Sequence, residues 1–245
     1  MSSWEMKAHL KLGDLSLDID LSGGERPLAL IGANGSGKTT ILRMILGLLQ
    51  PRDGFLRIGD QVFHDSAQGI HIPVEDRQLA YLPQGLGLFP HMTVAQNIAF
   101  VGGVEALTKE SLEEGKYSAF IQELGVHHYL DRWPSQLSAG ERQKVALARV
   151  LIQQPGMVLL DEPASALDIL ARREVRKILA KHLAELEIPT VLVTHDFRDV
   201  RELEADLAYL CDGRIQRVGS LDDFIGSSSG EFLSDDFLSE FLAQP

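Results

Sequence analysis

The chain has 245 residues, of which 44% are hydrophobic and 24% charged, a composition typical of a globular protein with a full core. Its net charge of −12 disfavours a basic nucleic-acid-binding surface, and its single cysteine, Cys211, excludes an internal disulfide. No apolar run approaches the ~18 residues of a transmembrane helix, and the N-terminus lacks a signal-peptide pattern. We therefore expect a cytoplasmic protein that meets a membrane only through a partner.

The first elements in chain order form a strand pair. Over residues 15–21, apolar side chains alternate with Ser16, Asp18 and Asp20, which predicts a half-buried strand. The Gly13-Asp14 pair predicts a turn from a partner strand over residues 7–12.

A βαβ layout follows. The apolar segment Pro27–Ile31 predicts a buried strand, a glycine-rich loop comes next, and Thr40–Leu49 predicts a helix. Further strands are predicted at Leu79–Leu82, Met157–Leu160 and Thr190–Thr194, with a helix at Leu167–Leu186.

The middle and the end of the chain have other patterns. Residues 94–154 contain little strand-like sequence and predict a helical insertion. Asp212-Gly213 predicts a hairpin between Leu207–Cys211 and Arg214–Val218. Residues 226–230 resemble a linker, and residues 233–242 have the spacing of a short amphipathic helix.

The glycine-rich loop carries the first chemical motif. Residues 32–39, GANGSGKT, match the phosphate-binding pattern G-x-x-x-x-G-K-[ST]. Gly35 and Gly37 leave room for phosphate oxygens, Lys38 reaches the β- and γ-phosphates, and the Thr39 hydroxyl binds Mg²⁺. The alternative, a chance glycine-rich turn, is disfavoured because the loop lies between a strand and a helix.

An acidic pair ends the strand at Met157–Leu160. Asp161 is placed to hold the Mg²⁺ shell, and Glu162 to polarise a water for attack on the γ-phosphate. Such a pair alone could equally be a solvated helix start, and the phosphate loop favours the catalytic interpretation.

A third motif makes a family resemblance specific. Residues 137–143, LSAGERQ, resemble the LSGGQ signature that defines ATP-binding cassette proteins. Ser138 and Glu141 also form a capping-box pattern, so a helix through Ile152 begins with exposed amides able to accept an anion. A mere helix cap is the alternative for this motif standing alone.

The resemblance covers Lys7–Gly219 and implies the site. Implied catalytic groups are Glu162, His195, Gln84 and Lys38. Implied Mg²⁺ ligands are Thr39, Gln84 and Asp161. Implied ATP contacts are Gly32, Ala33, Asn34, Gly35, Ser36, Gly37, Lys38, Thr39 and Thr40, with Ser138, Ala139, Gly140 and Asp168 from the other subunit. His127, His128 and Cys211 have no such context, and we assign them no metal.

Three positions depart from the family pattern. Ala139 replaces the first signature glycine, and Glu141 stands where glutamine is frequent. Leu12 occupies the position where many cassettes stack an aromatic ring on adenine. Trp4 is the alternative stacking residue, although it lies well before this position.

Two segments resemble prokaryotic importer ATPases, especially the molybdate/tungstate group. These are Val62–Pro73 and Leu88–Val94. Phe89, Pro90 and Met92 then line the groove for a permease coupling helix, or else simply pack at the start of the helical insertion. Sulfate, thiamine or polyamine import stays open, as does a soluble cassette ATPase acting on DNA or ribosomes. Glu162 and His195 disfavour a module that binds nucleotide without hydrolysis.

The resemblance implies an α/β fold with a P-loop (RecA-like) core and mainly parallel sheet, an N-terminal antiparallel β-subdomain and a helical insertion lobe. We expect one domain, with its core at residues 1–93 and 155–220, the helical lobe at 94–154 and a tail at 221–245. The expected assembly is a head-to-tail homodimer or paired cassette that binds ATP and Mg²⁺. It would lie peripherally on the cytoplasmic face of the membrane, with integral permease subunits and, indirectly, an extracytoplasmic solute-binding protein.

Overall fold

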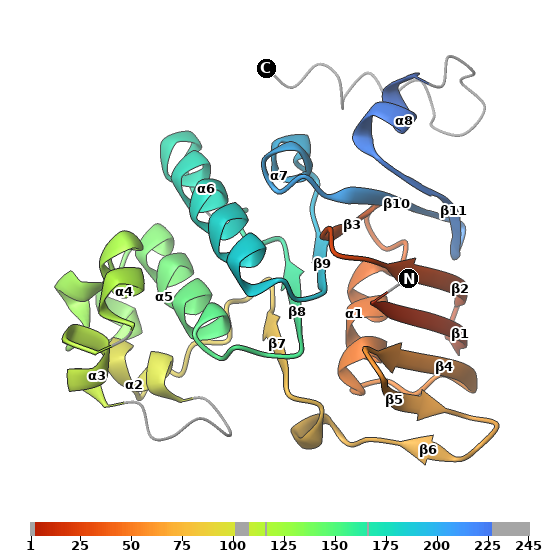
Figure 1. The fold of residues 1–245 in the computed structure, drawn as a ribbon, viewed down its shortest axis with the longest axis horizontal. Coiled ribbons are helices and arrows are strands. Elements are labelled where there is room, and N and C mark those ends of the chain that lie inside the picture. The colour runs from red at the N-terminus through yellow and green to blue at the C-terminus, as the bar shows by residue number, and fades with distance from the viewer. Residues whose placement is uncertain (1–2, 101–107, 116, 166, 227–245) are drawn as a thin grey trace. The chain divides into compact units, whose positions relative to one another are not determined.

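A computed structural model describes residues 3–100, 108–115, 117–165 and 167–226. The chain folds into two compact units (Figure 1). The first is formed by Met1–Gln78 together with Pro189–Pro245, and the second by Leu79–Ile188.

The N-terminal strands of the first unit are antiparallel, as predicted. β1 (Trp4–Leu12) pairs with β2 (Leu15–Gly23) across the predicted turn, and on its other side with β4 (Asp53–Ile58). The short strands β5 (Gln61–Asp65) and β6 (Ile70–His71) extend this subdomain. Alternate side chains of β1 and β2 are buried, which is why the sequence shows a period of two.

The remaining strands of the first unit contain the parallel core. β3 (Leu28–Ile31) is fully buried between two parallel neighbours, β10 (Asp206–Cys211) and β9 (Thr190–Val193). β10 forms the predicted hairpin with β11 (Arg214–Gly219), which joins β2. Within this unit the strand order is β6-β5-β4-β1-β2-β11-β10-β3-β9.

The helices of the first unit correct two predicted boundaries. α1 (Lys38–Leu46) ends three residues before the predicted Leu49, because Gly47 adopts the left-handed conformation (φ 81°) and closes the helix. The predicted linker residue Gly226 is the last residue of helix α8 (Leu221–Gly226). The predicted helix at residues 233–242 lies outside the described residues. α7 (Phe197–Glu202) and the 3₁₀ turn η1 (Val74–Asp76) complete this unit.

The second unit combines a parallel strand pair with helices. β7 (Leu79–Leu82) pairs with β8 (Met157–Asp161). α6 (Ile169–Leu186) begins two residues after the predicted start at Leu167, since Asp168 caps it. The other helical elements are α2 (Val94–Ala99), α3 (Lys109–Glu113), α4 (Ser118–Glu123), η2 (Val126–Tyr129), η3 (Pro134–Gln136) and α5 (Ala139–Leu151).

These helices share a buried apolar cluster that includes Ile98, Leu112, Ile121 and Val145. Between residues 94 and 154, the described part of the chain contains no strand, as the sequence predicts. The predicted α/β class, with N-terminal antiparallel strands and a parallel core, is confirmed. Over the residues that the structure describes, no helix is both long and apolar enough to span a bilayer.

Candidate functional site

The phosphate-loop residues lie where β3 gives way to α1. Gly32, Gly35 and Gly37 have φ of 150°, 79° and 107°, in the region that favours glycine. A Cβ on Gly32 would lie 2.3 Å from the Leu210 carbonyl oxygen, and one on Gly37 would lie 2.8 Å from Leu17 Cδ2. Backbone conformation favours glycine at both positions, and at Gly32 the Leu210 backbone also leaves no room for a side chain.

Lys38 is the first residue of α1 and is 6% exposed. Its Nζ donates hydrogen bonds to the carbonyl oxygens of Gly32 (2.8 Å) and Ala33 (2.9 Å). The ammonium group therefore lies over its own loop. An ammonium held there can exchange these weak acceptors for phosphate oxygens, which are stronger acceptors because they are charged.

His195 lies at the same edge of the sheet as this loop. β3 and β9 are parallel, with Leu30 paired to Val193. Gly32 comes two residues after Leu30, and His195 comes two residues after Val193. His195 is exposed, and the neighbouring Thr194 hydroxyl contacts the buried Asp199 carboxylate. Thr194 Oγ1 also accepts from the Asp196 amide at 3.0 Å, which fixes the backbone around His195.

The second unit brings Gln84 and the acidic pair together by the same geometry. Leu82 of β7 pairs with Leu160 of β8, so Gln84 and Glu162 both emerge at the carboxyl edge of this strand pair. Gln84 Nε2 donates to Glu162 Oε2 at 3.1 Å. Asp161 is buried at the end of β8, with the Tyr81 hydroxyl 3.5 Å from its Oδ2. Glu162 adopts φ 53°, an unfavourable region for a non-glycine residue.

The signature segment forms the predicted capping box at the start of α5. The Glu141 amide donates to Ser138 Oγ (3.2 Å), and the Ser138 amide donates to Glu141 Oε2 (2.7 Å). These hydrogen bonds from the Ser138 backbone and side chain lower the pKa of Glu141. The Glu141 carboxylate thus turns back onto the backbone, while Ser138 and Ala139 are exposed.

Asp168 has a local role that the sequence did not indicate. Its Oδ1 accepts hydrogen bonds from the amides of Leu170 (3.0 Å) and Ala171 (2.9 Å) and so caps α6. Directly after it, Ile169 and Leu170 are 75% and 80% exposed. A Cβ on Gly140 would lie 3.2 Å from Leu167 Cδ2, so the signature glycine lies close to this segment.

The two candidates for contact with the base differ in exposure. Leu12, at the end of β1, is 53% exposed. Trp4, at the other end of this strand, is 0% exposed and packs on Gly23. The alternative that Trp4 stacks on adenine is therefore wrong, because its ring is enclosed in the core.

The half-buried Phe89, which is predicted to line the permease groove, contacts the exposed Phe100 ring. Phe89 and Phe100 lie with ring centroids 4.6 Å apart, and Phe100 is 55% exposed. Pro90 is exposed and Met92 is half-buried. Sequence reasoning missed Phe100, although it is an aromatic residue at the end of a short amphipathic helix.

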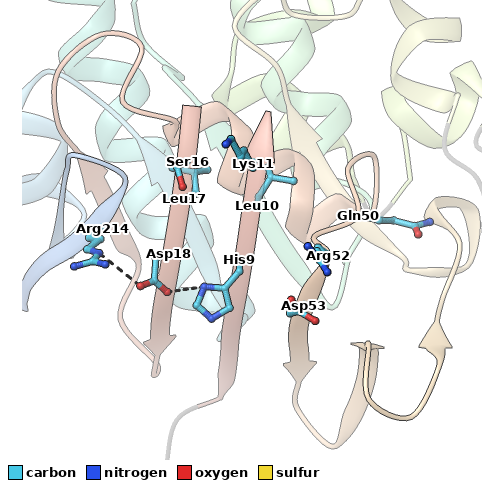
Figure 2. Close-up of a pocket in the computed structure, with 10 residues that line it drawn as sticks. All are labelled: His9, Leu10, Lys11, Ser16, Leu17, Asp18, Gln50, Arg52, Asp53 and Arg214. Carbon is cyan, nitrogen blue, oxygen red and sulfur yellow. Dashed lines mark ion pairs between the residues drawn. The ribbon is translucent and has the colours of Figure 1, made fainter. Parts of the chain in front are cut away.

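A hollow of about 600 Å³ lies on the first unit, and the ten residues that line it include none of the predicted site residues (Figure 2). Within it, Asp18 lies between His9 (2.8 Å) and Arg214 (3.5 Å). The carboxylate of Asp18 thus partly offsets the charge of Arg214 in this hollow.

The donors present fit a nucleotide with Mg²⁺. Ser36 Oγ, in the phosphate loop, is buried and has no hydrogen-bond partner among the described residues, as expected of a group that awaits a phosphate oxygen. The hydroxyl of Thr39, the amide oxygen of Gln84 and the carboxylate of Asp161 are the hard oxygen donors that Mg²⁺ prefers. In the described part of the chain, no cluster of three or more His, Cys, Asp or Glu side chains could hold a metal.

Comparison with known proteins gives a consistent family. The family model described as ABC transporter matches residues 14–165. The chain is 35% identical, over 95% of its length, to a molybdenum import ATP-binding protein of Mycobacterium tuberculosis, of which it covers 63%. It is 34% identical, over 98% of its length, to a molybdate/tungstate import ATP-binding protein of Archaeoglobus fulgidus, of which it covers 93%. A trehalose/maltose import ATP-binding protein of Thermococcus litoralis is 36% identical over 89% of the chain, which covers 58% of that protein.

The chain thus spans about three fifths of the length of the molybdenum relatives that it matches. Among solved structures, the fold matches a dimeric post-hydrolysis state of an ATP-binding cassette bound to ADP and Pi. The TM-score is 0.71 at 25% identity, over 89% of this chain and 98% of the other.

Proposed function

Because this chain belongs to the ABC transporter family, we propose that it is the ATP-hydrolysing subunit of a membrane importer. The observation that carries this proposal is the contact between Gln84 and Glu162, 3.1 Å apart and directly beyond the buried Asp161. An amide and a carboxylate at the carboxyl edge of parallel strands are placed to orient a water and accept its proton.

The phosphate loop supplies the binding site. Residues 32–40 would surround the phosphates with backbone amides, and the start of α1 adds its positive dipole. Lys38 would transfer its hydrogen bonds from the Gly32 and Ala33 carbonyls to phosphate oxygens, and Ser36 would gain the partner that it lacks.

Hydrolysis requires a base, an orienting group and charge stabilisation. Thr39, Gln84 and Asp161 would hold Mg²⁺, which when bound neutralises charge on the phosphate oxygens. Glu162 takes a proton from water as the water oxygen bonds to the γ-phosphorus. The bond from this phosphorus to the β–γ bridging oxygen breaks, and the electron pair leaves with ADP. His195 donates a hydrogen bond to the γ-phosphate, where charge gathers in the transition state.

A second subunit would complete each site. Ser138 Oγ and the start of α5 at Ala139 and Gly140 would face the γ-phosphate held by the other copy, and Asp168 would lie at the interface between the two copies. The dimeric state of the similar cassette structure supports pairing of two copies, and we propose that they pair head-to-tail. The helical lobe at residues 94–154 is then the part of the chain that presents the signature, between the core segments 1–93 and 155–220.

Coupling to transport is supported by the exposed aromatic surface and by the relatives. Phe89 and Phe100, with Pro90 and Met92, offer apolar area to a permease helix on the cytoplasmic face. The names of the relatives favour molybdate or tungstate as solute. An extracytoplasmic solute-binding protein would deliver it to the permease. A trehalose/maltose import protein is similar to this chain at a comparable sequence identity. The relatives therefore do not favour one solute alone, and sulfate, thiamine and polyamines stay as alternatives.

The test is co-purification of the tagged chain from detergent-solubilised membranes, followed by ATPase assay in liposomes that contain the recovered permease. We expect an integral membrane protein to co-purify and to stimulate turnover, and Phe100→Glu to weaken both effects. Val218→Glu, at another exposed apolar residue (47% exposed), is the matched control and should change neither. Recovery with ribosomes or DNA instead would contradict the proposal.

A further inference from the structure

The loop that follows Gln84 has an unusual backbone. Leu86 and Gly87 have φ of 63° and 60°, so two successive residues occupy the left-handed region. For Leu86 this conformation is unfavourable, because it brings Cβ close to the following carbonyl oxygen. Within the loop, the Leu86 amide donates to the Pro83 carbonyl at 2.8 Å, and the Gly87 amide to the Gly85 carbonyl at 2.8 Å. A side chain from elsewhere supplies the remaining restraint.

That side chain is Arg149, near the end of α5. Its Nη1 donates to the Gly87 carbonyl (2.8 Å), and its Nη2 donates to the Leu86 carbonyl (2.9 Å). The two nitrogens of one planar guanidinium thus fix two consecutive carbonyls, a geometry that lysine cannot reproduce. A Cβ on Gly87 would lie 3.3 Å from Arg149 Nη2, so glycine allows the guanidinium to approach the turn.

A contribution to the stability of the fold does not explain why a charged side chain occupies position 149. The side chain is 8% exposed, and its guanidinium donates to backbone carbonyl oxygens rather than to a carboxylate. Its charge faces the two carbonyls and the Phe89 ring, whose centroid lies 5.7 Å from Cζ. Burial lowers the pKa of Arg149. Burying a cation without a carboxylate costs free energy that an apolar residue would avoid, so a positional role better explains the guanidinium.

We propose that Arg149 is a positioning residue for ATP hydrolysis: by fixing the Leu86–Gly87 turn, it holds the Gln84 amide against Glu162. The inference rests on the proposed ATPase function. Gln84 lies two residues before this turn, and its contact with Glu162 depends on where the turn is held. Ser138 and Arg149 lie at opposite ends of the same helix, about 16 Å apart at the rise of an α-helix. Helix α5 therefore connects the signature serine rigidly to the Gln84 loop.

The experiment is a double-mutant cycle in the full-length chain, with single-turnover hydrolysis and ATP affinity measured separately. Arg149→Lys keeps the charge but loses the paired donors. We expect its rate of hydrolysis to fall about tenfold with ATP affinity unchanged within about twofold, as for misplacement of a catalytic group. In a Gln84→Ala background, Arg149→Lys should lower the rate less than about twofold further, because the group through which it acts is gone.

Arg77 provides a matched control. It is 3% exposed, donates to the carbonyls of Ile72 (2.8 Å) and Ile45 (2.5 Å), and its Cζ lies 5.9 Å from the Phe63 ring centroid. Arg77→Lys makes the same chemical change in a buried guanidinium of the first unit. The effects of Arg77→Lys and Gln84→Ala on the rate should be independent. The double mutant should therefore show the product of the two single-mutant reductions.

Different results would contradict the role of Arg149 and the proposed ATPase function. Independent, multiplying effects of Arg149→Lys and Gln84→Ala, or a normal rate in Arg149→Lys, would overturn the inference. If Arg149→Lys fails to fold, Gly87→Ala displaces the same contact and should show the same dependence on Gln84. A folded wild-type chain that binds ATP without hydrolysing it would refute the proposed function, and this inference with it.

Discussion

One buried side-chain amide, that of Asn97, holds the loop between Gln84 and α2, and we expect its removal to lower the free energy of unfolding substantially. Asn97 is 0% exposed, and its Oδ1 accepts from the Phe89 amide at 2.7 Å. Its Nδ2 lies within 3.0–3.1 Å of the carbonyl oxygens of Phe89, Met92 and Thr93. Asn97→Ala removes these contacts and leaves buried backbone groups without partners. With one acceptor and two donor hydrogens lost, at about 1 kcal/mol each, the free energy of unfolding should fall by about 3 kcal/mol.

The matched control is Gln96→Ala, one residue earlier on the same helix. Gln96 is exposed, and its side chain accepts from the Thr93 amide at 2.9 Å in the capping box, so its loss should cost only about 0.5–1 kcal/mol. Urea unfolding at neutral pH, followed by fluorescence and circular dichroism, measures both variants against wild type. If Asn97→Ala costs no more than Gln96→Ala, Asn97 does not hold this loop as described.

Three further predictions concern the site. Mixing Lys38→Ala with Ser138→Arg chains should restore partial ATPase activity through heterodimers with one intact site, and wild-type hydrolysis by Ser138→Arg monomers would exclude the shared site. Since Leu12 offers apolar contact but no stacking, GTP should be hydrolysed within about tenfold of ATP, and Leu12→Tyr should tighten nucleotide binding by up to about 1–3 kcal/mol with little change in turnover. The lowered pKa of Glu141 means that its contribution to stability is complete above the usual glutamate pKa and lost as the pH falls through the lowered value; in NMR titration, Ser138→Ala, which keeps the backbone donor but loses the side-chain hydrogen bond, should move this pKa part of the way back up.

The sequence predicts the parts of the fold that depend on local pattern. Alternation over residues 15–21, the Asp212-Gly213 turn and the Ser138–Glu141 capping box each depend on neighbours within a few residues, and the structure contains all three. The phosphate loop lies between a strand and a helix, as its local pattern predicts. The sequence also contains the signal that ends α1, the helix-terminating Gly47. The apolar residues on both sides of this glycine favour a longer helix and so hide that signal.

Contacts between distant segments could not be predicted in this way. Arg149 and Leu86 are 63 residues apart, and nothing in either segment identifies the other as its partner. The enclosure of Trp4 depends on Gly23, its partner in the adjacent strand. The alternation of buried residues along β1 does place Trp4 on the buried face of the strand. The contact of Gln84 with Glu162 required the pairing of β7 with β8, which the sequence suggested only through family resemblance.

The most direct test of the central claim is ATP turnover by Glu162→Gln, with nucleotide binding measured on the same preparation. The amide keeps the shape of the side chain and its place beside Gln84 but cannot accept the proton of the attacking water. ATP binding should be retained, and turnover should fall by at least about 10²-fold, the scale for losing a positioned general base. Turnover at the wild-type rate would contradict the assignment of Glu162 and, with it, the hydrolytic mechanism proposed for this site.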